Sequence, residues 1–196
     1  PKWASMAVHE HDLVKLDNGT FVLFYTGFDG SGDQGGIATS RDLISWRFAP
    51  DPVLTHRTKP PFPALASQAF WDGGHVRPRS LTRLGDWFYV LYEGANTEPA
   101  GSKHLQGCWD DSVGLARSRN LLDWDMDWPK ELAVSQQPGD GFDSLWTGWP
   151  RAVVRGSHVF IFYAAGGFDF QAAGTHHYAT TGVRVVPVAD FQNWAL

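Results

Sequence analysis

Three short hydrophobic runs divide the chain, and turn-forming residues precede each of them. The runs are continuous rather than alternating: FVLFY at 21–25, FYVLY at 88–92 and VFIFY at 159–163. Continuous β-branched and aromatic runs of strand length predict strands that are buried on both faces. The turns DNG (17–19), LGD (84–86) and RGS (155–157) separate each run from an earlier strand-like stretch and predict a hairpin. No segment keeps a 3.6-residue period, so few helices are expected.

A repeated phrase follows each hydrophobic run. GIATSRDLISW (36–46) and GLARSRNLLDW (114–124) are close copies, and GVRVVPVADFQNW (182–194) is a weaker third copy. Repetition on this scale indicates a repeated structural unit. Each unit contains a hairpin, a loop, a third strand and a short fourth strand that carries the tryptophan. This order predicts a four-stranded antiparallel sheet.

Stacked sheets explain why the runs are continuous. Sheets that pack face to face around an axis bury both faces of their middle strands, as the blades of a β-propeller do. We therefore predict an all-β chain that forms one propeller-type domain over residues 1–196, with blades at about 7–49, 72–126 and 143–196. Trp46, Trp124 and Trp194 are expected to pack between neighbouring blades. Three blades do not close a ring, so we expect the open edges to be covered by the missing blades of a longer enzyme, by another copy of the chain in a homo-oligomer, or by another chain.

Composition and charge narrow the classes of function. The chain has 196 residues, of which 43% are apolar and 19% charged, as is typical of a globular protein. A formal net charge of -5 without a basic stripe argues against nucleic acid as the main partner. Apolar runs no longer than a strand argue against a membrane span. Cys108 is the single cysteine, which excludes an internal disulfide and leaves the compartment open.

The repeated phrase resembles the GLAxSxDLxxW element of the five-bladed β-propeller glycosidases, the clan that contains glycoside hydrolase families 43, 32 and 130. The segment HEHDLVKLDNGTFVLFYTG (9–27) resembles the first-blade segment of the family 43 arabinan-cleaving enzymes. The resemblance implies hydrolysis of a glycosidic bond in an oligo- or polysaccharide of arabinan, xylan or fructan type. The expected partner is therefore a carbohydrate, and no cofactor is predicted.

Glycoside hydrolysis requires two carboxyl groups on opposite sides of the scissile bond. The resemblance implies that Asp12 is the general base. It also implies an Asp where this chain has Arg79, and a Glu acid where it has Gly148. Three alternatives remain open: the acid lies in blades outside this chain, the chain binds sugar without cutting it, or another carboxylate supplies the acid, the candidates being Glu93, Asp72 and Asp143.

Three arginines near the predicted carboxylates indicate that the site could bind an anion. The motifs RPR (77–79) and WPR (149–151) put Arg77, Arg79 and Arg151 at the starts of two inner strands. Guanidinium groups bind carboxylate and phosphate in a bidentate fashion. Family 130 relatives carry a Pro-Arg at a similar location and use phosphate, so the resemblance allows a phosphorolytic or acidic-sugar site. The alternative is that these arginines form structural salt bridges.

Aromatic and histidine side chains complete the predicted site. Trp146 and Trp149 stand at an inner-strand start, where an aromatic ring can stack on the C–H face of a sugar. His11, next to Asp12, is assigned with them to substrate binding.

The glycine-rich segment 29–35 matches two known motifs only superficially. A dinucleotide-binding motif requires a helix after it, and none is expected here; a calcium loop requires a glycine where this chain has Gln34. His9, His11 and His75 are more typical of hydrogen-bonded structure than of a metal site, so no metal is predicted.

Overall fold

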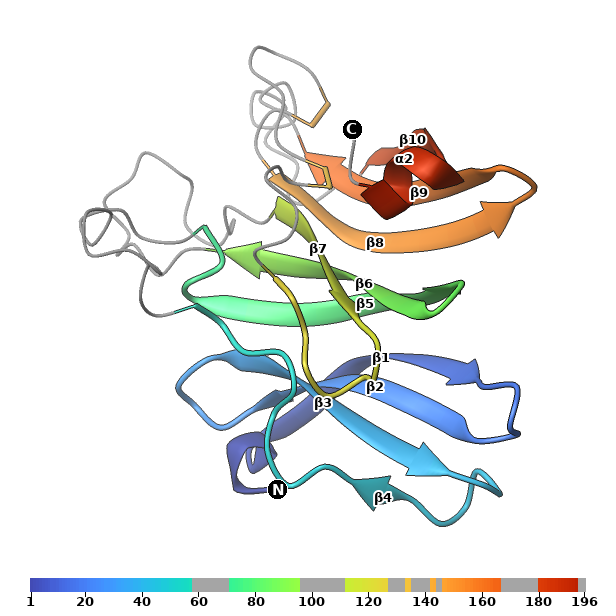
Figure 1. Cartoon of the computed structure of the whole chain (residues 1–196). Helices are drawn as coiled ribbons and strands as arrows, with labels where there is room; N and C mark the ends of the chain where they lie inside the picture. The colour runs from blue at the N-terminus through green and yellow to red at the C-terminus, as the bar shows by residue number, and fades with distance from the viewer. Residues whose placement is uncertain are drawn as a thin grey trace, which may run out of the picture.

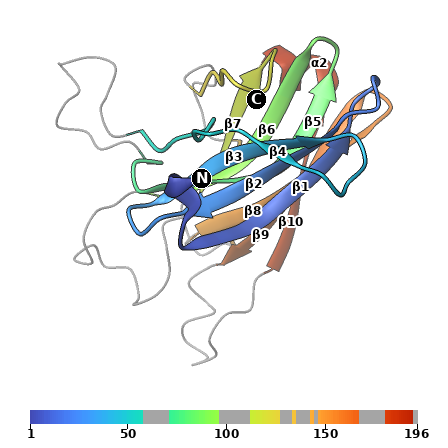
Figure 2. The same ribbon diagram turned by 90° about the horizontal axis from the view of Figure 1, so that it is seen from below.

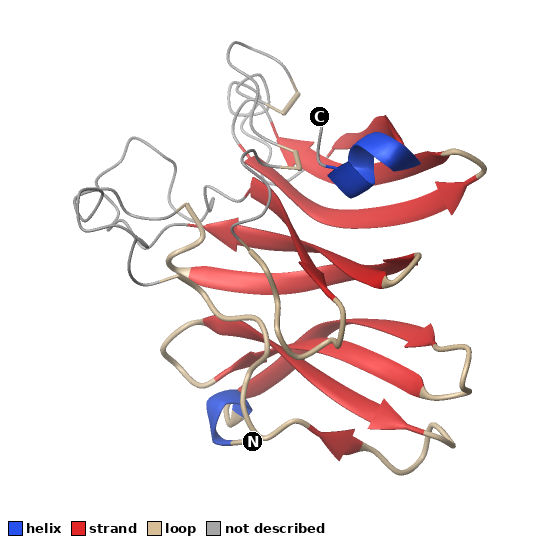
Figure 3. Cartoon of the chain, viewed as in Figure 1, coloured by secondary structure: helices blue, strands red, loops and turns tan. Residues whose placement is uncertain are grey.

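The computed structural model describes residues 1–57, 71–95, 112–126, 133–134, 142–143, 146–166 and 180–193. These residues form three antiparallel sheets, a short 3-10 helix η1 (Lys2–Ala4) and a helix α2 (Val188–Asn193). Figure 3 shows that strands dominate the described part of the chain. The predicted all-β, propeller-type architecture is confirmed.

The three sheets, here called blades one, two and three, follow one another along the chain. Blade one contains β1 (Ala7–Lys15), β2 (Phe21–Phe28), β3 (Asp33–Ser40) and β4 (Arg47–Phe48) in that spatial order. Blade two contains β5 (His75–Leu84), β6 (Trp87–Ala95) and β7 (Ser112–Ser118). Blade three contains β8 (Trp146–Arg155), β9 (His158–Gly166) and β10 (Thr180–Pro187). The blades stack in chain order, with blade two in the middle (Figures 1 and 2).

The predicted hairpins join the first two strands of every blade. Gly19, Gly85 and Gly156 have φ values of 80°, 61° and 59° at the three turns. Glycine reaches this left-handed region without steric cost, which allows a tight turn between paired strands. The first strand of each blade is an edge of its sheet, and β1 contacts β5 while β5 contacts β8. We call β1, β5 and β8 the inner strands.

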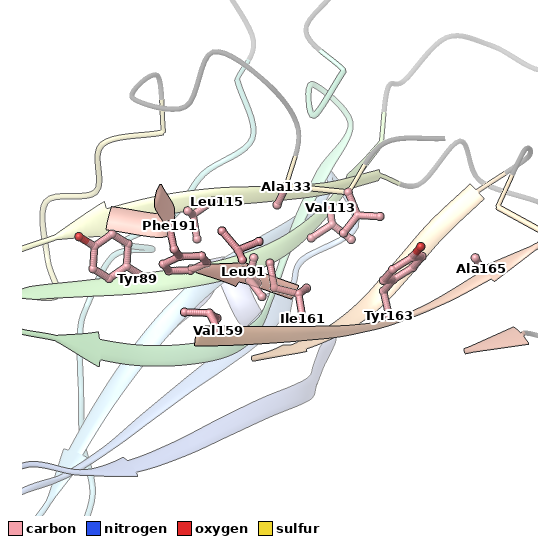
Figure 4. Close-up of a cluster of buried hydrophobic side chains, with 12 residues drawn as sticks. Tyr89, Leu91, Val113, Leu115, Ala133, Val159, Ile161, Tyr163, Ala165 and Phe191 are labelled. Carbon is pink, nitrogen blue, oxygen red and sulfur yellow. The ribbon is translucent and has the colours of Figure 1, made fainter. Parts of the chain in front are cut away.

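Two apolar cores lie between the blades. One contains Phe24 of blade one with Val90 and Tyr92 of blade two. The other joins blades two and three and includes Leu91 of β6, Ile161 of β9 and Phe191 of α2 (Figure 4). Burial of β6 on both faces was predicted from its continuous run, and every residue from Phe88 to Ala95 is buried.

The run in β9 does not follow that prediction. Val159 and Ile161 are buried against blade two, whereas Phe162 is 41% exposed. Prediction from the run alone was wrong here because a strand is buried on both faces only when a sheet covers each of them. Among the described residues, no sheet packs on the far face of blade three.

The repeated phrase forms the same turn in blades one and two. Ser40 and Asp42 accept backbone hydrogen bonds in the first turn, as Ser118 and Asn120 do in the second. Trp124 then stacks on Phe24 of blade one, with ring centroids 5.3 Å apart and planes at 17°. The prediction that Trp124 packs between blades is confirmed.

The other two repeat tryptophans differ from Trp124. Trp46 packs against Trp3 and Tyr25 on the side of blade one that faces away from blade two. Trp194 lies outside the described residues.

Within the ranges that the structure describes, a short fourth strand is present in blade one alone. There it is β4, while in blade two a single bridge between Arg117 and Asp125 takes its place. In blade three α2 occupies the residues just before Trp194, and the fourth strand predicted to carry Trp194 lies outside the described residues. Pro187 ends β10, and the fully buried ring of Phe191 anchors the helix in the core between blades two and three.

Candidate functional site

Each inner strand is interrupted by a β-bulge. The register shifts occur between His9 and His11, between Pro78 and Ser80, and between Gly148 and Arg151, and the residues within these bulges include Glu10, Arg79 and Trp149. Glu10 and Trp149 have positive φ values, 48° and 47°. Bulges redirect side chains, and strained non-glycine backbone persists where the surrounding structure holds it. These two positive φ values mark the bulges as the candidate site.

Arg79 is the centre of this site. Its guanidinium is buried and donates to Glu93 Oε2 through Nε at 2.5 Å and also through Nη2. Its Nη1 lies 2.7 Å from Glu10 Oε1 of blade one. One arginine therefore joins two carboxylates, and with both ionised the three groups carry a net charge of -1.

Glu93 comes from the middle strand of blade two, and its side chain is fully buried. Besides Arg79, it accepts a hydrogen bond from the Trp149 amide at 3.2 Å through Oε1. The sequence identified Glu93 as a candidate acid. The structure places it at the centre of the site, but with both oxygens engaged by protein donors.

Trp149 is half exposed and stands beside Arg79, whose guanidinium carbon lies 5.6 Å from a ring centroid. Trp146 meets Trp149 edge to face, with centroids 5.3 Å apart. Both tryptophans were predicted to be substrate-binding residues. The structure brings them together with the charged groups and leaves Trp149 accessible.

Glu10 was not identified from the sequence. Its Oε2 is buried and accepts no hydrogen bond from the described residues, although His9 Nδ1 lies 3.5 Å away. The other nitrogen of His9 is 3.3 Å from Asp33, which in turn accepts a hydrogen bond from Arg77 at 2.6 Å. The segment HEHDL contains this second carboxylate, but the strand pattern gives no sign of the bulge that turns it toward Arg79.

Asp12 has a different environment. Its Oδ2 accepts a hydrogen bond from the Leu81 amide of blade two at 2.7 Å, and its Oδ1 accepts one from the Leu13 amide at 3.1 Å. Arg151 Nη1 is 3.4 Å from the same carboxylate. Asp12 thus bonds blade one to blades two and three.

Arg151 contacts all three inner strands. Besides Asp12, it donates to the backbone carbonyl of Arg79 and, at 3.3 Å, to that of His11. The His11 side chain is exposed, and Arg151 contacts the backbone carbonyl of this residue. Arg77 and Arg79 form the salt bridges described above, so all three predicted arginines have acidic neighbours.

Asp143 and Asp72 each accept a hydrogen bond from a tyrosine of the middle strand. Asp143 is buried and accepts a hydrogen bond from the Tyr163 hydroxyl at 3.3 Å. Burial raises the pKa of Tyr163, and the nearby Asp143 carboxylate raises it further. Asp72 accepts from Tyr92 at 2.9 Å in blade two. These matching bonds indicate a structural role for both acids.

In each blade, an aromatic residue four positions before the inner strand stacks on a tyrosine of the middle strand. The pairs are Trp3–Tyr25 at 5.7 Å, Trp71–Tyr92 at 5.6 Å and Phe142–Tyr163 at 6.3 Å between centroids. This repeat was missed in the sequence because its spacing becomes visible only once the strand starts are known. Trp71 of blade two thus corresponds to Trp3 of blade one and Phe142 of blade three.

Metal-ligand clusters and membrane-spanning helices are absent from the described ranges. No group of three His, Cys, Asp or Glu side chains there is arranged to hold a metal ion. No helix among these residues has the length and apolar character needed to cross a bilayer. Cys108 lies outside the described residues.

Known structures share this arrangement of blades. A glycoside hydrolase matches with a TM-score of 0.65 at 20% identity, covering 96% of this chain and 47% of that one. A family 117 glycoside hydrolase from the marine bacterium Zobellia galactanivorans gives 0.65 at 17% identity, with 91% and 51% covered. A β-1,2-mannobiose phosphorylase from Listeria innocua gives 0.60 at 10% identity, with 95% and 42% covered.

These matches establish the fold. The predicted likeness to the propeller glycosidase clan is confirmed at that level, since structures of families 32 and 130 are among the matches. Family 43 in particular stays a prediction. The chain spans about half the length of the structures it matches. No family model matches the sequence, and no curated protein matches it either.

Proposed function

We propose that the chain belongs to a carbohydrate-active protein and that it binds a glycan at the site formed by Glu10, Arg79, Glu93 and Trp149. The observation that carries this proposal is the convergence of three bulged inner strands on one arginine, two carboxylates and an exposed indole. The fold shared with glycoside hydrolases and a mannobiose phosphorylase supports the substrate class.

The chemistry of the site suits a sugar. An exposed indole offers a flat apolar surface to the C–H face of a sugar ring at low entropic cost. Glu10 Oε2 is buried without a hydrogen bond from the described residues, so a sugar hydroxyl that reaches the bulge would fill an unsatisfied acceptor. Arg79 keeps the carboxylate in place through its salt bridge.

Hydrolysis of a glycosidic bond is the reaction we propose, with the first-blade carboxylates as candidates for the general base. Asp12 was predicted for this role from the sequence. Its oxygens accept hydrogen bonds from two backbone amides, and the one from Leu81 links Asp12 to blade two. Glu10 has one oxygen without a hydrogen bond from the described residues, and it pairs with Arg79, which stands beside Trp149. We therefore add Glu10 as the stronger candidate for the general base.

Phosphorolysis is the second candidate function. A mannobiose phosphorylase is among the matched structures, and Arg151 leaves about half of its guanidinium side chain exposed beside the site. Arg79 favours phosphate less, because two glutamates already neutralise it. Dependence of sugar release on inorganic phosphate distinguishes the two reactions.

The experiment combines binding and sugar release. Arabinan, xylan, fructan and β-1,2-mannan oligosaccharides are titrated calorimetrically into the wild-type chain and into Trp149→Ala, and release is assayed with and without phosphate. We expect the Trp149→Ala substitution to weaken glycan binding about tenfold, which corresponds to about 1.4 kcal/mol. Glycan binding that is absent in the folded wild type, or that survives Trp149→Ala unchanged, contradicts the proposal.

Two isosteric variants assign the reactive carboxylate. Glu10→Gln should abolish sugar release while preserving glycan binding. Asp12→Asn should lower the melting temperature of the chain and leave glycan binding and sugar release largely unchanged. Loss of release in Asp12→Asn alone would instead confirm the assignment predicted from the sequence. Binding without release in the wild type would favour the alternative of a protein that recognises sugar without cutting it.

A further inference from the structure

His9 stands between two carboxylates at the junction of blades one and two. Its Nε2 lies 3.3 Å from Asp33 Oδ1 of β3, and its Nδ1 lies 3.5 Å from Glu10 Oε2 of its own strand. Asp33 is itself paired through Oδ2 with Arg77 of blade two, at 2.6 Å. One imidazole ring therefore has a carboxyl oxygen at each of its two nitrogens.

Asp33 determines which nitrogen of His9 carries a proton. Its carboxylate is held by Arg77 and acts as an acceptor, so it favours the neutral imidazole that has its hydrogen on Nε2. Nδ1 then presents a lone pair to Glu10 Oε2, which is buried and receives no hydrogen bond from the described residues. Two acceptors face each other at this contact, and one proton between them would satisfy both.

The charged groups around this contact form a chain that alternates in sign across the two blades. Its members, in order, are Arg77, Asp33, His9, Glu10, Arg79 and Glu93. Two arginines face three carboxylates, so the chain has a net charge of -1 while His9 is neutral. A proton on His9 brings this sum to zero, and the carboxylates on both sides of the ring stabilise it there.

We propose that His9 is a positioning residue for Glu10 and receives the proton that Glu10 removes from water. This inference rests on the proposed function, in which Glu10 is the general base of hydrolysis. The water oxygen bonds to the anomeric carbon as the glycosidic C–O bond breaks, and the leaving oxygen takes a proton from the general acid. The proton of the water passes to Glu10 Oε2 and then to His9 Nδ1, while Asp33 stabilises the imidazolium. Exchange with solvent returns both groups to their starting states.

Nitrogen NMR of the imidazole rings tests the proton on His9 directly. Spectra of the histidine-labelled chain, assigned with His9→Asn, should show hydrogen on Nε2 and none on Nδ1 at alkaline pH. Glu10→Gln should lower the titration midpoint of His9 by about one pH unit, because it removes a carboxylate that stabilises the imidazolium. His158→Asn changes an exposed histidine of blade three and is the matched control, which should leave the midpoint unchanged.

Asp33→Asn tests how the tautomer of His9 is fixed. An amide both donates and accepts, so neutral His9 should populate both N–H forms in this variant instead of the Nε2–H form alone. Circular dichroism and the melting temperature establish that each variant is folded.

Sugar release tests the role of His9 in the reaction. His9→Asn should lower kcat at least tenfold and leave glycan binding unchanged, because the proton on Glu10 loses its acceptor. It should also shift the pH profile of release, which a purely structural role of His9 would not do. His158→Asn should match the wild type in both measurements.

Three results would overturn the proposal. The first is a neutral His9 with its hydrogen on Nδ1, since that nitrogen would then donate to Glu10 and could not receive a proton from it. The second is a midpoint of His9 that Glu10→Gln leaves unchanged. The third is unaltered kcat and pH profile in His9→Asn. A folded wild type that releases no sugar would overturn the catalytic step together with the proposed function, and the NMR midpoints would still show whether Glu10 and His9 share a proton.

Discussion

Glu93 occupies the space that a side chain at residue 148 would need. A Cβ placed on Gly148 would overlap Glu93 Oε1, and that oxygen is held by the Trp149 amide. The family resemblance implies a glutamate at position 148, whereas this chain has a glutamate from the neighbouring blade directly against it. The glycine and Glu93 thus form one unit: the missing side chain in blade three makes room for a carboxylate from blade two.

Gly148→Ala should therefore disturb the site without touching any charge. The added methyl displaces the Glu93 carboxylate from the Trp149 amide, and overpacking of this kind costs about 1 to 3 kcal/mol in unfolding free energy. Urea denaturation measures it. In the background of Glu93→Ala, which vacates the space, the same substitution should cost clearly less. Equal costs in both backgrounds would mean that the two residues are not coupled.

Arg79→Met should be among the most destabilising single substitutions in the described chain. It leaves Glu93 buried without its cation, and breaking a buried ion pair in this way costs about 3 to 5 kcal/mol. The double variant Arg79→Met/Glu93→Leu removes both charges and should recover more than half of that loss. A double variant no more stable than Arg79→Met would show that the cost comes from packing rather than from the unpaired carboxylate.

Trp124 should contribute strongly to the contact between blades one and two. Core Trp→Ala substitutions cost about 3 to 5 kcal/mol, and because Trp124 is only partly buried we expect about 2 to 4 kcal/mol for Trp124→Ala. Trp124→Phe keeps an aromatic ring against Phe24 and should retain most of the stability. Thermal unfolding compares the three proteins, and equal losses in both variants would argue against stacking as the cause.

Asp42 should make the stability of the chain depend on pH at the acid end. Hydrogen bonds from the Ser45 and Ile44 amides and from the Ser40 hydroxyl lower the pKa of Asp42 from 3.8 to about 2. A carboxyl with a lowered folded pKa stabilises the fold fully above its unfolded pKa and loses that contribution as pH falls through the folded one. The stabilisation should therefore be complete at neutral pH and disappear between about pH 4 and pH 2.

Asp42→Asn isolates that contribution. The same turn in blade two has Asn120, whose Oδ1 accepts the corresponding amides, so an asparagine fits this geometry. The variant should melt below the wild type at pH 7, and the difference should vanish as the pH approaches 2. A difference that persists at pH 2 would show that the turn does not depend on the charge of Asp42.

Local chemistry made much of the fold predictable. Hairpins formed where glycine turns separate apolar runs, as at Gly19 and Gly85, because that signal lies within a few residues. The repeated phrase predicted the packing of Trp124 between blades. The helix α2 was not predicted from the sequence, because what fixes it is the burial of Phe191 between blades two and three, a tertiary contact.

The candidate site was only partly predictable. Arg79, Glu93 and Trp149 were identified from the sequence by residue type and position, and the structure brings them together. Glu10 was missed because a bulge shifts the register by one residue and turns a side chain to a new direction. Nothing in HEHDL distinguishes Glu10 from Asp12 until the partner strand is known.

The sequence by itself determined the strands, their hairpins, the blade repeat and most of the side chains that form the site. These features depend on periodicity and turn chemistry, which act over short distances along the chain. Only the tertiary structure decided which carboxylate meets Arg79, why residue 148 is a glycine, and which face of blade three stays exposed. Such relationships join residues of different blades, and they are fixed by how sheets pack in space rather than by neighbours in sequence.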